Sequence, residues 1–552
     1  MNNVSRKKNS FINFISGIGN RLLTMLLSFA VRTVFVKYLN AEYLGVNGLY
    51  TNILTMLSLA ELGFGTAMVY SMYKPLAEKD EQKLRQLMKL YKKVYMIIGW
   101  VVLVVGLCLV PFLDVLIKDK PDVKGLTFYY ILFLLDSVFS YWFFAYKSSL
   151  LQADQKLYIT TNYSIVFNII KSGLQIAVLI ILHNFTAYLI MQIVCTIGQN
   201  ICVAIKVNKT YPYLNIKDKT KLPKNERNKI FGDVKALMLT KIGYVALNGT
   251  DNIIISAFVG VKQVGLLSNF LMISDAITAV LTQVAASISA SLGNFFVKEE
   301  NDSGYCLFKR IDFLNFWTHG FSMVALITLL KPFVNIWLGK DYLIEQNAVV
   351  CIGINFFVAG FINTMSTFRT TLGLFTQGKY RPIIVAVINI GLSILLSYKW
   401  GMTGVLAATF ISRLCVNLWY DPLLIHRDGF NKPVKPYYFK LLFRFSLLAC
   451  VVVVMQLISS AVFVGGVTII KFIIMVIITA ILPNVVFALV FNKIEEFKYF
   501  KTLFFKNILK KVTKNFLYKV NSFFLNATHI PPHNFTQITK TRKSSFSTSP
   551  LL

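Results

Sequence analysis

The chain has 552 residues, of which 55% are hydrophobic and only 15% are charged. Soluble domains carry roughly 25% charged residues, so this composition excludes a soluble globular protein and predicts a multi-pass membrane protein. The formal net charge of +32 would suggest a nucleic-acid partner in a soluble protein. Here the basic residues concentrate in loops, so we expect no nucleic-acid partner.

The first apolar segment, residues 11–38, contains two arginines. Arg21 and Arg32 are eleven residues apart, about three helical turns, so they project from one face of a helix. Thr24 and Ser28 lie on the same polar stripe. A charged side chain at the centre of a bilayer costs roughly 2.5–3.5 kcal/mol. The stripe therefore predicts a water-filled or anion-filled cavity beside this helix.

Apolar segments of about 20 residues, the length that crosses a bilayer, recur along the whole chain. We expect an all-α polytopic protein with about fourteen spans, at residues 11–38, 44–72, 94–117, 126–150, 158–182, 186–206, 234–259, 264–292, 313–338, 345–372, 381–398, 402–425, 441–463 and 467–491. The loops after even-numbered spans are rich in Lys and Arg, whereas the others hold few. The positive-inside rule therefore predicts that both termini lie in the cytoplasm.

Three runs in the first half of the chain recur in the second half. Glu42–Tyr50 resembles Lys262–Phe270 (offset 220), Pro111–Asp114 resembles Pro332–Asn335 (offset 221) and Leu150–Tyr158 resembles Leu372–Tyr380 (offset 222). The common offset predicts a duplication of six spans, which gives two parallel, pseudo-symmetric lobes around a central cavity. The predicted organisation is a six-helix lobe at 1–231, a second at 232–430, two additional transmembrane helices at 431–495 and a basic, then polar, cytoplasmic tail at 496–552.

Ionisable residues inside the spans are the candidate functional groups. Arg21 and Glu61 lie at similar depth, so we expect them to pair, either as a structural salt bridge or at a substrate or ion site. Arg32 and Asp251 lie at corresponding places in the two lobes, nearer the outer side, which suggests an outer gate. The candidate substrate ligands are Arg21, Arg32, Lys171 and Arg413, and the candidate ion-coupling or gating residues are Glu61, Asp136, Asp251 and Asp275.

The sequence shows no grouping of residues typical of a catalytic site. It has five scattered histidines, no nucleophile elbow and no Walker motif. The seven cysteines lack CxxC spacing and mostly lie in apolar runs, which indicates neither a disulfide framework nor a metal site. We therefore expect a protein that moves a substrate, and not an enzyme, with no cofactor.

Two runs resemble a known family. LSLAELGFGTAMVYSMYKPLAEKDEQKLRQLMKLYKKVY (Leu57–Tyr95) and GTDNIIISAFVGVKQVGLLSNF (Gly249–Phe270) are similar to the oligosaccharide-repeat-unit, Wzx-type flippases of bacterial polysaccharide biosynthesis. These belong to the superfamily of multidrug extruders and lipid II flippases. The resemblance implies a polyprenyl-diphosphate-linked oligosaccharide, such as an exopolysaccharide or capsule repeat unit, moved from the inner to the outer leaflet of the bacterial plasma membrane by alternating access.

Other functions stay open from the sequence. Within the superfamily these are a lipid II flippase or a drug/cation antiporter, and outside it a membrane polysaccharide polymerase or ligase. Arginines that face a cavity argue against organic cations as cargo, and the short predicted outer loops argue against a polymerase. The expected partners are the lipid-linked oligosaccharide and membrane lipids, with a polysaccharide polymerase and glycosyltransferases as candidate protein partners.

Overall fold

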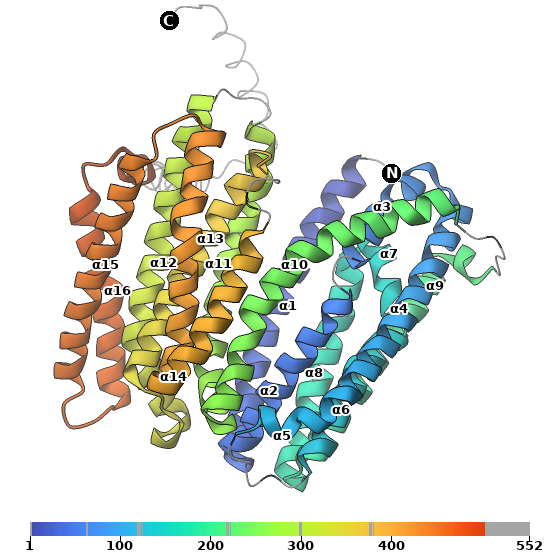
Figure 1. Cartoon of the computed structure of the whole chain (residues 1–552), viewed down its shortest axis with the longest axis horizontal. Helices are drawn as coiled ribbons and strands as arrows, with labels where there is room; N and C mark the ends of the chain where they lie inside the picture. Colours follow the sequence, from blue (N-terminus) through green and yellow to red (C-terminus); the bar gives the residue numbers. More distant parts are fainter. Residues whose placement is uncertain are drawn as a thin grey trace, which may run out of the picture. The chain divides into compact units, whose positions relative to one another are not determined.

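The structure is a computed structural model that describes residues 3–502 except 62–63, 119–122, 124, 217–219, 221, 297–300, 375–377 and 379 (Figure 1). Its described residues form helices, turns and loops, without a strand. The α-helices are α1 (Asn3–Tyr38), α2 (Ala41–Leu57), α3 (Phe64–Glu78), α4 (Glu81–Leu109), α5 (Leu113–Leu116), α6 (Leu126–Trp142), α7 (Ser148–Ala153), α8 (Leu157–Leu182), α9 (Phe185–Thr210), α10 (Lys224–Phe258), α11 (Val261–Phe296), α12 (Asn301–Leu338), α13 (Gln346–Thr371), α14 (Arg381–Leu424), α15 (Lys435–Val462) and α16 (Ile469–Phe491). The predicted all-α class is confirmed.

The helices follow the predicted membrane spans. Within the described residues, ten are long and apolar enough to cross a membrane, and α6 with Ala145–Ala153, bent by 43°, gives an eleventh. The long α14 leaves helical geometry at Gly401 (φ 52°, ψ −133°), so it supplies two successive spans. The pair α2 and α3, and the helix α10, lie at the predicted segments 44–72 and 234–259. The chain is therefore a multi-pass membrane protein with about fourteen spans.

Internal contacts divide the chain into two units, Met1–Asn484 and Val485–Leu552. The described part of the second unit contains the last turns of α16 and a short helical segment that ends at Thr502. The tail after residue 502, predicted to be polar and cytoplasmic, lies outside the described residues.

Polar caps fix where several of the apolar helices begin. The Asn40 side chain accepts hydrogen bonds from the backbone N–H groups of Glu42 (3.1 Å) and Tyr43 (3.2 Å) at the start of α2. Asn184 accepts from Ala187 N–H (3.2 Å) at the start of α9. These bonds satisfy first-turn donors that the helix itself leaves unpaired. We call the end of the bundle where α1 ends and α2 begins the Asn40 end.

The two lobes meet where α2 packs along α11. A Cβ on Gly45 would overlap the Val261 carbonyl oxygen, and a Cβ on Gly265 would overlap the Ala41 carbonyl oxygen. Ala41 and Gly45 correspond to Val261 and Gly265 at the repeat offset of 220. Each lobe thus presents the same glycine to the same backbone group of the other lobe. Only glycine lets the two backbones approach this closely.

The half of α1 nearest the Asn40 end also contacts the second lobe. Trp337 Nε1 on α12 donates to Thr33 Oγ1 (2.8 Å), and the Trp337 ring lies 5.0 Å from the Phe29 ring. Tyr342 donates its hydroxyl proton to the Val36 carbonyl oxygen (3.4 Å). These contacts and the glycine crossing join the two lobes at the Asn40 end.

A buried ion pair attaches α15, which lies outside the duplicated lobes, to α12. Arg444 Nη1 lies 2.6 Å from Asp312 Oδ2, and the Tyr437 hydroxyl donates to Asp312 Oδ1 (2.9 Å). Arg444 and Asp312 are each 2% exposed. The Arg444 guanidinium also lies 4.9 Å from the centre of the Phe316 ring. Removing one member would leave the other charge buried without compensation.

The glycine crossing predicts a steric effect of alanine. Gly45→Ala should lower the free energy of unfolding by about 1–3 kcal/mol, because the methyl group meets a backbone carbonyl that cannot move without separating α2 from α11. The measurement is thermal unfolding of the purified protein in detergent. Gly17→Ala is the matched control, since no atom lies within 4 Å of its Cβ position. Equal unfolding temperatures for both variants would contradict the close packing.

The α12–α15 ion pair predicts a larger loss. Arg444→Met should lower the free energy of unfolding by about 3–5 kcal/mol, and adding Asp312→Leu should recover part of it. Arg427→Met is the control, because Arg427 pairs with Asp428 (2.6 Å) while 63% of its side chain is exposed. An exposed pair contributes little, so that variant should unfold like the wild type. A double variant no more stable than Arg444→Met would contradict the pairing.

Candidate functional site

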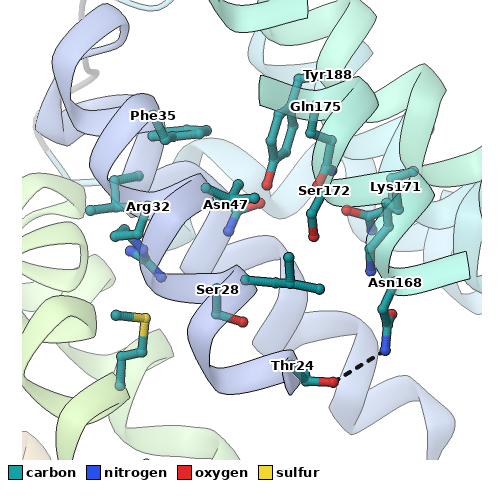
Figure 2. Close-up of a pocket in the computed structure, with 15 residues that line it drawn as sticks. Thr24, Ser28, Arg32, Phe35, Asn47, Asn168, Lys171, Ser172, Gln175 and Tyr188 are labelled. Carbon is teal, nitrogen blue, oxygen red and sulfur yellow. Dashed lines mark hydrogen bonds between the residues drawn. The ribbon is translucent and has the colours of Figure 1, made fainter. Parts of the chain in front are cut away.

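A cavity of about 270 Å³ lies in the first lobe, bounded by α1, α2, α8 and α9, with Met272 of α11 at its wall (Figure 2). Most of its lining side chains are polar but uncharged: Thr24, Ser28, Asn47, Asn168, Ser172, Gln175, Tyr188 and Gln192. Two further lining residues, Arg32 and Lys171, are cationic, and none of the lining residues that the structure describes is a carboxylate. The cavity is therefore a polar site with an excess of positive charge.

The helix α1 contributes one side of the cavity through residues four apart. Thr24, Ser28 and Arg32 follow one another at this spacing, so they share a face of the helix. Arg32 Nη1 donates to Ser268 Oγ (2.8 Å) and to Asn269 Oδ1 (3.4 Å), both on α11. Both acceptors are neutral, so the positive charge of Arg32 is not cancelled by these bonds. Arg32 therefore joins the two lobes and remains available to an anion.

The helix α8 contributes the facing side. Asn168, Lys171, Ser172 and Gln175 are spaced by three or four residues and all line the cavity. Figure 2 shows Lys171 and Arg32 at opposite ends of the cavity, with Ser28 and Ser172 between them. Asn168 Nδ2 donates to Thr24 Oγ1 (3.2 Å), which ties α8 to α1. An anion between the two cations would also meet several neutral hydrogen-bond donors.

A carboxylate lies behind the cavity wall. Asp136 on α6 accepts a hydrogen bond from Gln192 Nε2 (2.7 Å), and Gln192 lines the cavity. The second oxygen of Asp136, Oδ1, is buried and has no hydrogen-bond partner. Asp136 therefore orients Gln192 and does not itself line the cavity.

The predicted pair of Arg21 and Glu61 is wrong for this structure. Glu61 ends a 3-10 turn, Ser58–Glu61, that interrupts the helical path between α2 and α3. Its carboxylate accepts a hydrogen bond from the Tyr95 hydroxyl on α4, and the Tyr91 hydroxyl donates to that of Tyr95 (3.1 Å). Arg21 is exposed. The break in the helix turns Glu61 into the first lobe, a direction that depth along a straight helix does not predict.

Arg32 and Asp251, the suggested outer gate, are also separated here. Asp251 Oδ2 accepts from Thr409 Oγ1 (2.8 Å), and Asn389 Nδ2 donates to the same hydroxyl oxygen (3.0 Å), so Asp251 faces the interior of the second lobe. Arg413 lies in this region, where Nη1 donates to the Asn355 carbonyl oxygen (3.4 Å). Arg32 does contact the second lobe, but through Ser268 and Asn269 of α11 and not through Asp251.

The structure thus brings together two of the four predicted substrate ligands, Arg32 and Lys171, while Arg413 is buried in the second lobe and Arg21 is exposed. Of the predicted acidic residues, Asp275 is exposed on α11. The cavity also contains four residues that the sequence did not lead us to predict: Ser172, Gln175, Tyr188 and Gln192. The regular spacing of the α8 residues was a usable signal, whereas Tyr188 and Gln192 on α9 follow only from helix packing.

The fold is that of known membrane transporters. A structure of the lipid II flippase MurJ, in an inward closed conformation, aligns with a TM-score of 0.60 at 17% identity and covers 90% of this chain and 99% of its own. A multidrug resistance MATE family transporter of the MOP superfamily aligns in its inward-facing conformation with a TM-score of 0.56 at 15% identity, covering 74% of this chain and 97% of its own. An outward-facing conformation of a MATE family transporter aligns with a TM-score of 0.51 at 14% identity and covers 74% of this chain and 93% of its own. At these identities the likeness shows a shared fold.

The family follows from the sequence match. Residues 7–290, just over half of the chain, match the family described as Polysaccharide biosynthesis protein. The chain therefore belongs to this family. No curated protein matches the sequence.

The contacts of Arg32 predict a crosslinking pattern. In membranes, Arg32→Cys combined with Ser268→Cys should be joined by a short bismaleimide, because the native side chains are in contact across the lobes. Arg32→Cys with Asp251→Cys should react far less, since Asp251 faces into the second lobe. Mass spectrometry of the digested protein detects the products, and Arg32→Cys alone controls for the native cysteines. Faster crosslinking of the 251 pair would contradict this arrangement.

Proposed function

We propose that the protein is a flippase that moves a polyprenyl-diphosphate-linked oligosaccharide from the inner to the outer leaflet of the bacterial plasma membrane. One observation carries the proposal: Arg32 and Lys171 line the same polar cavity, and among the described residues no carboxylate lines it with them. Cations held in a span are costly unless an anion or water compensates them. A diphosphate is an anion that such a site would bind through charge-assisted hydrogen bonds.

The size of the cavity indicates which part of the cargo it holds. Its volume of about 270 Å³ lies below the roughly 300–1,000 Å³ typical of sites for drug-sized ligands. We assign it to the diphosphate. The sugars and the polyprenyl tail then lie outside it, with the tail among the membrane lipids.

The proposed orientation places the Asn40 end outside the cell. The loops at the opposite end are rich in Lys and Arg, which favours the cytoplasm for both termini. The contacts at the Asn40 end, including Arg32 with Ser268, then close the outer side. Alternating access requires these contacts to separate when the cargo leaves, so Arg32 would exchange its neutral partners on α11 for the diphosphate during the cycle.

The acidic residues are candidates for coupling transport to an ion. Asp136 is connected to the cavity through Gln192 (2.7 Å), so a change in its charge would act on the diphosphate site. Glu61 and Asp251 belong to separate hydrogen-bonded groups within the two lobes, and Asp275 is exposed. We assign the coupling role first to Asp136, with the others as alternatives. Glycosyltransferases would supply the cargo, and a polysaccharide polymerase would use it.

The cavity argues against one other function, and the sequence argues against another. An organic-cation antiporter needs negative charge where its cargo binds, and the lining of this cavity has only positive charge. A membrane polymerase or ligase needs a catalytic group on the outer side, and the sequence shows no catalytic constellation. Translocation of an anionic lipid is the remaining function of these three.

A lipid II flippase is the second candidate. The MurJ structure covers 90% of this chain and the inward-facing multidrug transporter only 74%. The flippase thus also matches part of the chain beyond the two duplicated lobes. Lipid II likewise carries a diphosphate, so the cavity does not separate the two cargoes. Complementation separates them, because only the true function restores growth to a lipid II flippase mutant or polysaccharide to a repeat-unit flippase mutant.

The cationic cavity predicts the effect of neutral substitutions. Arg32→Gln and Lys171→Gln should each reduce export about tenfold or more, because a lost hydrogen bond to a charged group is worth roughly 1.5–3 kcal/mol. Lipid-linked repeat units should accumulate on the cytoplasmic side of the membrane, as measured in spheroplasts. Lys171→Arg should retain most of the activity, since it keeps the charge.

Lys37→Gln is the matched control, because Lys37 is an exposed cation on the same helix that does not line the cavity. Its export should equal that of the wild type. Normal export by Arg32→Gln and Lys171→Gln at wild-type protein levels would overturn the proposed diphosphate site.

A further inference from the structure

A second cavity, of about 700 Å³, lies at the Asn40 end of the second lobe. It is formed by the turn between α10 and α11, the beginning of α13 and the turn at Gly401 in α14. Its volume falls within the roughly 300–1,000 Å³ of typical ligand sites. In the proposed orientation it opens on the outer side, where the translocated glycan emerges.

The lining of this cavity combines one indole ring with planar polar groups. Trp400 is 56% exposed and lines the cavity together with the amides of Gln263 and Asn347. The Glu345 carboxylate accepts a hydrogen bond from Thr403 Oγ1 (3.1 Å). In the described part of the chain, the amides of Gln263 and Asn347 make no hydrogen bond, so their donors and acceptors are free for a ligand.

The first lobe has large aromatic residues at two positions that correspond to polar residues of this cavity. Gln263 corresponds to Tyr43 at the repeat offset of 220. We align Thr403 with Phe185, since each lies two residues after a residue with positive φ, Gly401 (φ 52°) and His183 (φ 49°). In the first lobe the rings of Tyr43 and Phe185 lie 5.3 Å apart. The second lobe has an amide and a hydroxyl at these two places.

The geometry points to a saccharide-binding site in this cavity. A sugar ring presents an apolar C–H face, which packs on an exposed indole, and hydroxyl groups that exchange paired hydrogen bonds with planar amides and carboxylates. Trp400 supplies the indole, Gln263 and Asn347 supply two amides, and Glu345 supplies a carboxylate. The site would hold the glycan after translocation. That the bound sugar is the transported glycan rests on the proposed function, whereas the binding of a sugar in this cavity does not.

A different role for Trp400 has to be separated from sugar binding. Tryptophan and tyrosine are enriched at membrane interfaces, where they anchor helix ends whatever their neighbours. Tyr398 provides the comparison, because it is 75% exposed on the same turn but packs on Phe258 (5.3 Å) and does not line the cavity. An interface anchor predicts equal effects at Trp400 and Tyr398, whereas a sugar site predicts an effect at Trp400 alone.

The test is direct binding of lipid-free sugars to the purified full-length protein in nanodiscs. The probes are chito-oligosaccharides, galactose-containing and rhamnose-containing disaccharides, and a partial hydrolysate of the polysaccharide of the producing strain. Titration calorimetry should show saturable binding of at least one probe. Asn347→Ala should weaken it about threefold to tenfold, the effect of one neutral hydrogen bond, Trp400→Ala should abolish it, and Tyr398→Ala should leave it unchanged.

The outcomes separate this inference from the proposed function. No saturable binding of any probe, or equal losses in the Trp400 and Tyr398 variants, would overturn the saccharide site. Because free sugars bind without transport, normal export by the Arg32 variant would overturn the diphosphate cavity and leave this result standing. Wild-type sugar affinity in Arg32→Gln is the expected independence control, since Arg32 does not line the second cavity.

Discussion

The rest of the described structure depends on the backbone contact between α2 and α11. Because Gly45 and Gly265 have no side chain, each helix rests directly on a carbonyl group of the other. Gly45 and Gly265 are 220 residues apart, the offset of the predicted repeat, and so are the residues whose carbonyl groups they face, Ala41 and Val261. The contact therefore consists of the same glycine–carbonyl arrangement twice. It brings α1 against α11 and α12, where Arg32 and Thr33 find partners in the second lobe. A side chain at either glycine would separate the elements that form the interlobe contacts.

Four acids in the spans differ from the cations of the first cavity. Each of the four is hydrogen-bonded to a polar or cationic side chain: Glu61 to Tyr95, Asp136 to Gln192, Asp251 to Thr409 and Asp312 to Arg444. Arg32 and Lys171 instead face a cavity without a carboxylate. Burying an ion requires a compensating partner, and here the acids have one within the protein. The positive charges of Arg32 and Lys171 would instead be compensated by water or by an anionic ligand in the cavity.

The two lobes share a fold but differ in what fills their ends. At the Asn40 end of the first lobe, Tyr43 and Phe185 pack in an aromatic cluster with Tyr129. In the second lobe, Gln263 and Thr403, which we align with Tyr43 and Phe185, line a cavity together with Trp400. Duplication of a helical scaffold thus leaves each copy free to change its side chains. The first lobe has its cationic cavity between α1 and α8, and the second has its polar cavity beside the Gly401 turn.

The sequence by itself determined the membrane spans and the polar face of α1, because these depend on composition and on the helical period, and it predicted the duplication from the recurring runs. Thr24, Ser28 and Arg32 share a face wherever the helix lies. Only the tertiary structure decided which side chains the buried acids contact. Glu61 turns to Tyr95 because a 3-10 turn breaks the helical path, and Asp251 turns to Thr409 inside its own lobe. The sequence predicts how deep a side chain lies in the membrane, but two side chains at one depth meet only if their helices are neighbours and are rotated toward each other. Packing between segments far apart in the chain sets both conditions.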